Sequence, residues 1–248
     1  FMARVDEIRG LAEFHAESIS SSPIDWMNYL DTAAKLYRYP FMDQLLIHAQ
    51  RPHATACASL ELWNEKMFRW VNRGAKGIAL LDETMQKTRL RYVFDIQDTH
   101  MVRGGRSPYL WQIQEGQQAA VLNHLEEVYS LETKDIETLS DALMATAKYM
   151  VEENLEEYLD GLLYVTGDTY LEELDEDTIR SDFRSLLTDI IYYTLAVRCG
   201  IDPMERLEET DFRHITDYNH LSVLTFIGNA TSRASESVLV DIGRYVHR

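Results

Sequence analysis

The sequence predicts an α+β protein, with N-terminal helices and a small antiparallel sheet followed by a mainly α-helical acidic region. Apolar residues recur at helical spacing near the N-terminus and through most of the second half of the chain. Between residues 68 and 97 the pattern changes to short runs of aromatic and branched residues, separated by Gly or charged turns, which is typical of strands. The two halves also differ strongly in charge.

The charge difference is large for a chain of 248 residues with a formal net charge of −17. Residues 1–113 hold 14 Lys and Arg against 13 Asp and Glu, whereas residues 114–248 hold 10 against 28. Within residues 35–106 the balance is 12 against 7, a net of +5. A basic segment followed by a strongly acidic one is a hint of function, although solubility alone also accounts for such a difference.

The composition, 46% hydrophobic and 26% charged, predicts a folded protein with a substantial core. Cys57 and Cys199 form no C-x-x-C pair, so we expect no disulfide framework and a reducing compartment, the cytoplasm. No apolar run approaches the roughly 18 residues that a membrane span needs, so no membrane association is predicted. Phe1 before Met2 and a helical pattern running to Arg248 predict a piece of a longer polypeptide.

The first half of the chain divides into an arm and an α+β domain. Residues 1–22 are expected to form an N-terminal arm that ends in a Ser-Pro hinge, and residues 23–113 form the domain. Helical spacing runs from Trp26 to Tyr37 and resumes after Pro40 until Arg51-Pro52 ends it. A short helix containing Leu62 and Trp63 follows. One antiparallel sheet is predicted from strands at 68–72, 77–81 and 90–97, with a last strand at 109–111.

Residues 114–248 are predicted to form the acidic helical domain. Helices are expected at 117–129, 134–152, 177–199, 221–228 and 231–247. The clearest of them ends at Gly200 and has one apolar face, made of Ile179, Phe183, Leu186, Leu187, Ile190 and Ile191. The acidic runs at 152–153, 156–157 and 172–177 are interpreted as a solvated helix face.

Motifs for catalysis and metal binding are missing from the sequence. None of the eight histidines belongs to an H-E-x-x-H pattern, and the pairs His48/His53 and His214/His220 are interpreted as surface or capping residues. There is no G-x-S-x-G elbow, Walker loop or G-x-G-x-x-G, and residues 74–77 are expected to form a β-turn. We therefore predict no catalytic residue, no metal, no cofactor and no enzymatic activity. A hydrolase with an unrecognised carboxylate site remains an alternative.

Basic residues interleaved with aromatic residues are the main functional signal. Single-stranded nucleic acid is held by this combination, because bases stack on rings while phosphates follow the cations. The alternative is that the tryptophans are core residues and the cations form a solvated rim. The candidate DNA-binding residues are Lys35, Arg38, Tyr39, Trp63, Lys66, Arg69, Trp70, Arg73, Lys76, Arg91, Arg103 and Arg106.

Four motifs follow one another in the first half: Leu45-Leu46-Ile47 with Gln50 and Pro52, Leu62-Trp63, the turn Val71–Ile78, and Tyr92–Ile96 ending at Thr99. In this order they resemble the N-terminal domain of the ArdC antirestriction family, over residues 24–113. The resemblance implies single-stranded DNA binding, in proteins carried by plasmids and conjugative elements. The chain departs from the family at Asp43 and Asp98, which add negative charge on or near the expected binding surface.

The second half resembles the zinc-peptidase-like domain of complete ArdC-type proteins, in which H-E-x-x-H is followed by a later Glu ligand. The segment from Asp189 to Asp202 resembles that later helix, with Asp189 at the position of the third ligand, and residues 221–246 resemble the closing helices. Because H-E-x-x-H is absent here, the resemblance implies a zinc-free relative of the peptidase fold. Similar N-terminal regions occur in very large Firmicute mobile-element proteins that also carry helicase or methyltransferase modules.

Two functions are therefore expected from different classes. The first is a non-catalytic DNA-handling module of a mobile genetic element, either single-stranded DNA binding or related to antirestriction. The second is an acidic interaction module or DNA mimic that docks a basic partner, such as a restriction enzyme or a neighbouring domain of the same polypeptide.

Overall fold

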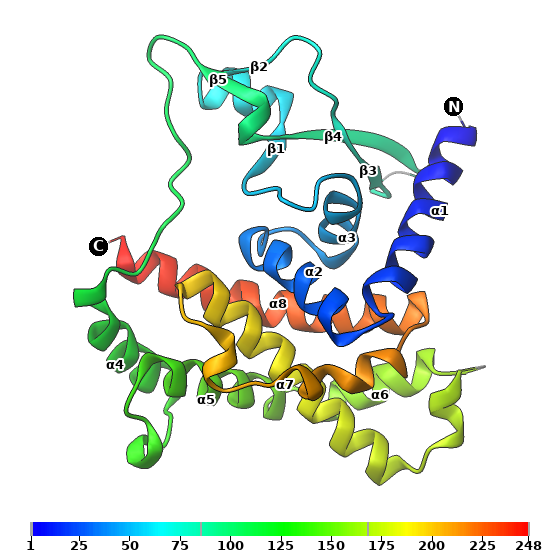
Figure 1. Ribbon diagram of the computed structural model, residues 1–248, viewed down its shortest axis with the longest axis vertical. Helices are drawn as coiled ribbons and strands as arrows, with labels where there is room; N and C mark the ends of the chain where they lie inside the picture. Colours follow the sequence, from blue (N-terminus) through cyan, green and yellow to red (C-terminus); the bar gives the residue numbers. More distant parts are fainter. Residues whose placement is uncertain (1, 85, 168, 248) are drawn as a thin grey trace.

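A computed structural model describes residues 2–84, 86–167 and 169–247 and confirms the α+β class (Figure 1). The N-terminal helices are α1 (Met2–Ile19), α2 (Pro23–Lys35) and α3 (Phe41–Gln50). Helix α2 begins where the Ser22 side chain accepts a hydrogen bond from the Asp25 backbone N–H, with Pro23 in the first turn. The sequence predicts an arm before residue 23, whereas α1 packs against α3 and β3 and buries Ala12, Ala16 and Ile19.

The strands form two antiparallel sheets within the described residues, so the prediction of one sheet is wrong. The larger sheet has the order β1 (Cys57–Ser59), β4 (Arg89–Asp95), β3 (Ile78–Asp82), and Ile78 lies opposite Val93. The smaller sheet is a ribbon of β2 (Arg69–Val71) and β5 (Thr99–Met101), in which Trp70 lies opposite His100. Residues 109–111 form no strand, contrary to the prediction.

The β2–β5 ribbon lies at one end of the molecule, far from α4–α8 at the other end (Figure 1). A π-helical turn, η1 (Leu62–Lys66), leads into β2, and a 3₁₀ turn, η2 (Ile96–Asp98), leads into β5. After β5 an extended segment, residues 102–114, runs back along the molecule to the helices. The ribbon is therefore connected to the helical region through a long segment without regular secondary structure.

The second half of the chain is helical, as predicted. Its main helices are α4 (Gln118–Tyr129), α5 (Leu139–Glu152), α6 (Leu155–Val165), α7 (Glu176–Cys199) and α8 (Leu221–Val246). Short 3₁₀ turns connect them: η3 (Glu115–Gln117), η4 (Thr133–Asp135), η5 (Tyr170–Glu173), η6 (Pro203–Glu205) and η7 (Glu209–Thr216). The predicted apolar face of α7 is buried, and Gly200 ends this helix with a φ of 78°. The sequence predicts two helices where α8 is continuous, and it does not predict α6.

A continuous cluster of buried apolar side chains joins the two halves of the chain. Helix α2 packs on α7 and α3 packs on α8, with Trp26, Phe41, Ile190 and Ile227 in the same cluster. Helices α3 and α8 approach so closely that a Cβ at Gly228 would lie 2.0 Å from Cδ2 of Phe41. The predicted domains 23–113 and 114–248 thus share a core. Within the described ranges, no helix combines the length and apolar character needed to cross a membrane.

Candidate nucleic-acid interface

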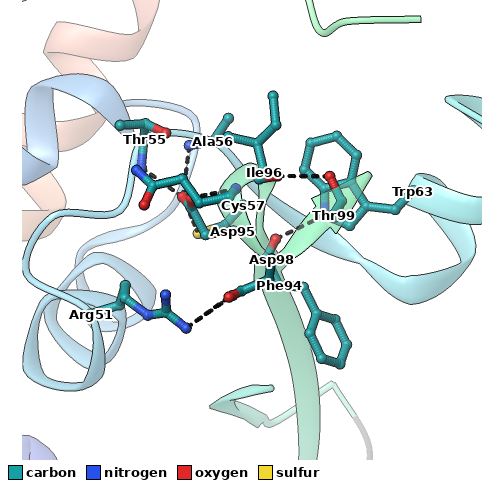
Figure 2. Close-up of polar contacts among 11 residues, drawn as sticks. Arg51, Thr55, Ala56, Cys57, Trp63, Phe94, Asp95, Ile96, Asp98 and Thr99 are labelled. Carbon is teal, nitrogen blue, oxygen red and sulfur yellow. Dashed lines mark hydrogen bonds and ion pairs between the residues drawn. The ribbon is translucent and has the colours of Figure 1, made fainter. Parts of the chain in front are cut away.

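The end of β4 is fixed by a buried carboxylate (Figure 2). Asp95 is 1% exposed, and its Oδ2 accepts hydrogen bonds from the backbone N–H groups of Thr55 (2.7 Å) and Ala56 (3.2 Å). Its Oδ1 accepts a third from the Gln97 N–H at 2.9 Å. Burial, together with the nearby Asp95 carboxylate, raises the pKa of the Cys57 thiol. These hydrogen bonds connect residues 55–56, which precede β1, to the 3₁₀ turn η2, which leads from β4 into β5.

Further contacts in Figure 2 set the position of the ribbon. The Trp63 indole N–H donates to the carbonyl of Phe94 at 2.8 Å, and the Thr99 hydroxyl donates to the carbonyl of Ile96 at 2.7 Å. Trp63 is only 2% exposed, so its ring cannot stack on a base. The prediction that Trp63 binds DNA is corrected: the residue anchors η1 to β4, because burying a large ring favours its use in the core.

The two carboxylates that depart from the family pattern are each paired with an arginine. Asp98 binds Arg51 at 2.9 Å, and Asp43 binds Arg91. Burial raises the pKa of Asp43, while the Arg91 guanidinium opposes that shift. The negative charge expected from these residues is thus offset locally, and Arg91 is already engaged by a carboxylate.

The β2–β5 ribbon presents aromatic and apolar side chains to solvent. Trp70 is 55% exposed and lies directly across the ribbon from His100, which is also exposed. Phe68 and Met101 are about half exposed. The Arg69 side chain donates through Nε to the Thr99 hydroxyl at 2.9 Å, which aligns it along the ribbon. Exposed apolar side chains that gather on one short ribbon, and are not scattered singly, are typical of an interaction site.

Two turns place cations at the two ends of this ribbon. The first turn, residues 72–77, uses Gly74 at a φ of 89° and carries the predicted residues Arg73 and Lys76. The second turn, residues 102–106, uses Gly104 at a φ of 85°. The backbone N–H of Arg106 donates a hydrogen bond of 2.8 Å to the carbonyl of Met67.

The second turn carries Arg103 and Arg106, and it brings the backbone of Arg106 beside Met67, the residue that follows Lys66 at the end of η1. Lys66, Arg73, Lys76, Arg103 and Arg106 are all exposed, and none forms an ion pair with another described residue. Strand β2 covers only Arg69–Val71, about 7 Å from the first Cα to the last, so the two cation-bearing turns lie at the two ends of the strand that carries Trp70. Exposed Glu61 and Glu65 on the η1 side partly offset the positive charge.

The remaining predicted residues lie elsewhere. Lys35, Arg38 and Tyr39 line a groove of about 840 Å³ between the end of α2, β1, residues 109–113 and the end of α7. This groove also contains Arg198, which the sequence reading did not select. Arg198 contacts Trp111, 87 positions away in the chain, so no local pattern could have identified it.

The helical half brings no metal site together among the described residues, where no group of three or more His, Cys, Asp or Glu side chains is placed to hold an ion. Asp189 lies in a cleft between α5 and α7, where burial and then the charge of Asp211 raise its pKa to about 7. The sequence predicts that His48 is a surface or capping residue, but the structure buries it. It is 8% exposed and shares a hydrogen bond of 2.7 Å with His15.

Comparisons of the chain with protein-family models, curated proteins and solved structures find no match. The resemblance to the ArdC family therefore stays a prediction, and the functional argument depends on the geometry of the ribbon and of the groove.

Proposed function

We propose that this chain is a non-catalytic module that binds single-stranded DNA through the β2–β5 ribbon. The observation that carries the proposal is the exposed Trp70 ring between two cation-bearing turns. A base can stack on the indole while the flanking phosphates meet Arg73 and Lys76 on one side and Arg103 and Arg106 on the other. Each of these groups is available, since none is held by a carboxylate of the described chain.

The arrangement favours a single strand over a duplex. In a duplex the base faces are stacked on one another, so an aromatic side chain reaches them only after the helix is opened. A major groove admits a two-stranded ribbon as well as a helix, but this ribbon has only three residues in each strand and could contact few base edges there. Stacking on Trp70 is also tolerant of sequence, so we expect little base specificity.

The cellular setting of the proposal has separate support. The two cysteines of the described chain, Cys57 and Cys199, are free, which fits the reducing cytoplasm. The assignment to a mobile genetic element, with a role in DNA transfer or antirestriction, depends on the ArdC resemblance alone. The proposal needs no cofactor.

Fluorescence anisotropy with a labelled single-stranded oligonucleotide tests the proposal, with the duplex of the same sequence as comparison. We expect binding that weakens as salt rises, with log affinity falling linearly against log salt. Trp70→Ala should weaken binding by about 1–3 kcal/mol through lost stacking. The double change Arg73→Ala and Lys76→Ala should reduce the salt slope by about 1.4, the value for two single-strand phosphate contacts.

Lys134→Ala is the matched control, because it removes one exposed cation outside the ribbon and the groove. It should leave both affinity and salt slope unchanged. Equal binding of the Trp70→Ala variant and the unaltered protein would overturn the assignment of the ribbon.

A second candidate function rests on the acidic helices. Helix α6 carries exposed Glu157 and Asp160 beside Leu163 and Tyr164, and Tyr164 is 91% exposed. An exposed ring among carboxylates suits a basic protein partner, with fast association at low salt. If oligonucleotides fail to bind even at low salt, titration with a polyarginine peptide tests this candidate. Binding should then weaken in a Tyr164→Ala variant.

A further inference from the structure

Among the residues that the structure describes, none that lines the groove beside the end of α7 is a carboxylate. Its lining residues are Lys35, Leu36, Tyr37, Arg38, Tyr39, Thr55, Ala56, Cys57, Tyr109, Leu110, Trp111, Gln112, Ile113, Val197, Arg198, Cys199 and Gly200. The whole chain has 41 Asp and Glu and only 24 Lys and Arg. A groove of about 840 Å³ whose described lining holds three cations and no acid is therefore a local exception to the negative charge of the protein.

Two of these cations share one aromatic ring. The guanidinium carbon of Arg198 lies 5.7 Å from the centre of the Tyr37 ring and 3.7 Å from that of Trp111. The guanidinium carbon of Arg38 also lies 5.7 Å from the Tyr37 ring centre. The close stacking on Trp111 orders the Arg198 guanidinium, so this group loses little side-chain freedom on binding. The exposed Arg38 guanidinium has the weaker contact, near the limit of a cation–π interaction.

Most of the N–H donors of the two guanidinium groups have no acceptor among the described residues and can donate to a ligand. Arg198 uses one terminal nitrogen to donate to the Trp111 carbonyl at 2.8 Å, and Arg38 uses Nε to donate to the Tyr37 hydroxyl at 3.3 Å. A guanidinium has five N–H donors. No ion pair within the described residues involves Lys35, Arg38 or Arg198.

Like charges in this position oppose one another. Burial lowers the pKa of Arg198, and the charge of Arg38 acts in the same direction. An arginine nevertheless stays protonated at neutral pH. Two cations that cannot neutralise by losing a proton, in a partly enclosed groove with no carboxylate among its described lining residues, are stabilised when an anion binds beside them.

We propose that this groove binds the phosphate group of a nucleotide, with Arg38 and Arg198 as the main ligands and Lys35 at the rim. A guanidinium matches two phosphate oxygens at once, which a point charge does not. The exposed Tyr109 ring and the half-buried Tyr39 ring line the same groove and offer a face for the base. This site goes beyond the function proposed for the ribbon, because its residues come from α7 and from the segments that flank α2 and α4.

The test is isothermal titration with inorganic phosphate and with dAMP, at an ionic strength held constant with chloride. We expect both to bind, and dAMP to bind more tightly because of the base. The double change Lys35→Ala and Arg38→Ala should weaken both by about tenfold or more, the loss expected for a hydrogen bond between charged groups. Both side chains are exposed, so the variant should fold. Lys134→Ala should bind phosphate and dAMP normally.

Arg198→Lys gives a second, independent readout. It keeps the positive charge but loses the planar fork, so binding of dAMP should weaken while the far-ultraviolet circular dichroism stays unchanged. Absence of heat with both phosphate and dAMP, or equal affinity in the Lys35→Ala and Arg38→Ala protein, would overturn the proposal.

Two further arms identify the source of the phosphate and separate this site from the ribbon. The first arm compares a short oligonucleotide that has a 5′-phosphate with its unphosphorylated form. If the phosphorylated form binds more tightly, and the difference disappears when Arg38 is replaced, the ligand is a DNA end. Equal binding of the two forms, with dAMP still bound, indicates a free nucleotide. Trp70→Ala should weaken oligonucleotide binding and leave dAMP binding unchanged. Failure of the ribbon assignment would therefore not remove this site.

Discussion

The ribbon and the helical turn η1 that leads into it use tryptophan in opposite ways. Trp63 and Trp70 are seven positions apart, yet Trp63 is 2% exposed and hydrogen-bonded to β4, whereas Trp70 is 55% exposed on β2. Trp63 packs in the core and supports the fold, whereas Trp70 is positioned only by the backbone pairing of β2 with β5. The difference teaches that an aromatic residue near cations is evidence of binding only where its ring is free of the core.

The largest expected effect is a difference in stability between variants of Trp63 and Trp70. Trp63→Ala should lower the free energy of unfolding by about 3–5 kcal/mol, because it removes a fully buried ring and orphans the Phe94 carbonyl. Trp70→Ala should change stability by no more than about 0.5 kcal/mol. Urea unfolding of both variants measures the contrast. A similar loss in the two proteins would show that Trp70 packs into the structure.

The second prediction concerns the close approach of α3 and α8. Gly228→Val should destabilise by about 2–3 kcal/mol, since its side chain would collide with the Phe41 ring. Gly10→Ala on α1 is the matched control, because a Cβ at Gly10 meets nothing within 4 Å. It should stabilise by about 0.5–1 kcal/mol. Thermal unfolding of both variants gives the answer, and a neutral Gly228→Val would mean that the helices separate easily.

The helical half should lose stability as pH rises. The folded-state pKa of Asp189 is raised to about 7, so the penalty for burying its charge grows between about pH 4 and pH 7 and persists above. Asp189→Asn should therefore stabilise at pH 8 by about 1–2 kcal/mol, after allowance for its partial exposure, and change little at pH 4. Asp160→Asn, on an exposed site of α6, serves as control. Equal gains at the two pH values would contradict this origin.

The N-terminal helices should respond to pH in the opposite sense. Burial, then the charges of His15 and His53, lower the pKa of His48 to about 4. The stability that depends on neutral His48 is present above about pH 6.5 and is lost as pH falls toward 4. Between pH 7 and pH 5 we expect a loss of about 1 kcal/mol, which His48→Gln should reduce. Burial also lowers the pKa of the neighbouring His15, so His15 should account for the loss that remains. His220 is exposed, so a His220→Gln variant should lose as much stability between pH 7 and pH 5 as the unaltered protein. A smaller loss in this variant would contradict the assignment to His48.

Much of the fold could be predicted because its signals are local. The apolar face of α7 and its Gly200 cap follow from spacing and from a single positive φ. Helix α6 was missed because Glu156 and Glu157 dominate its appearance, although Leu155, Leu159 and Leu162 repeat at helical spacing. Helix α8 was divided because Gly228 resembles a helix end, while in fact this glycine makes room for Phe41.

The candidate site could be predicted only in part, since exposure and pairing depend on distant residues. Sequence identified the cations of the ribbon but could not show that Trp63 is buried or that Arg91 is held by Asp43. It also could not separate Lys35 and Arg38 from the ribbon. They belong to a groove completed by Arg198, whose position depends on the packing of α2 against α7.

The uneven exposure of the tryptophans gives the protein a built-in optical reporter. Trp26, Trp63 and Trp111 are buried at 1%, 2% and 4% exposure, so Trp70 alone among the four is accessible to a collisional quencher such as acrylamide. Quenching of intrinsic emission should therefore report the state of the ribbon without any label. A strand of DNA that stacks on Trp70 would shield it from the quencher, and emission would lose its only water-exposed component.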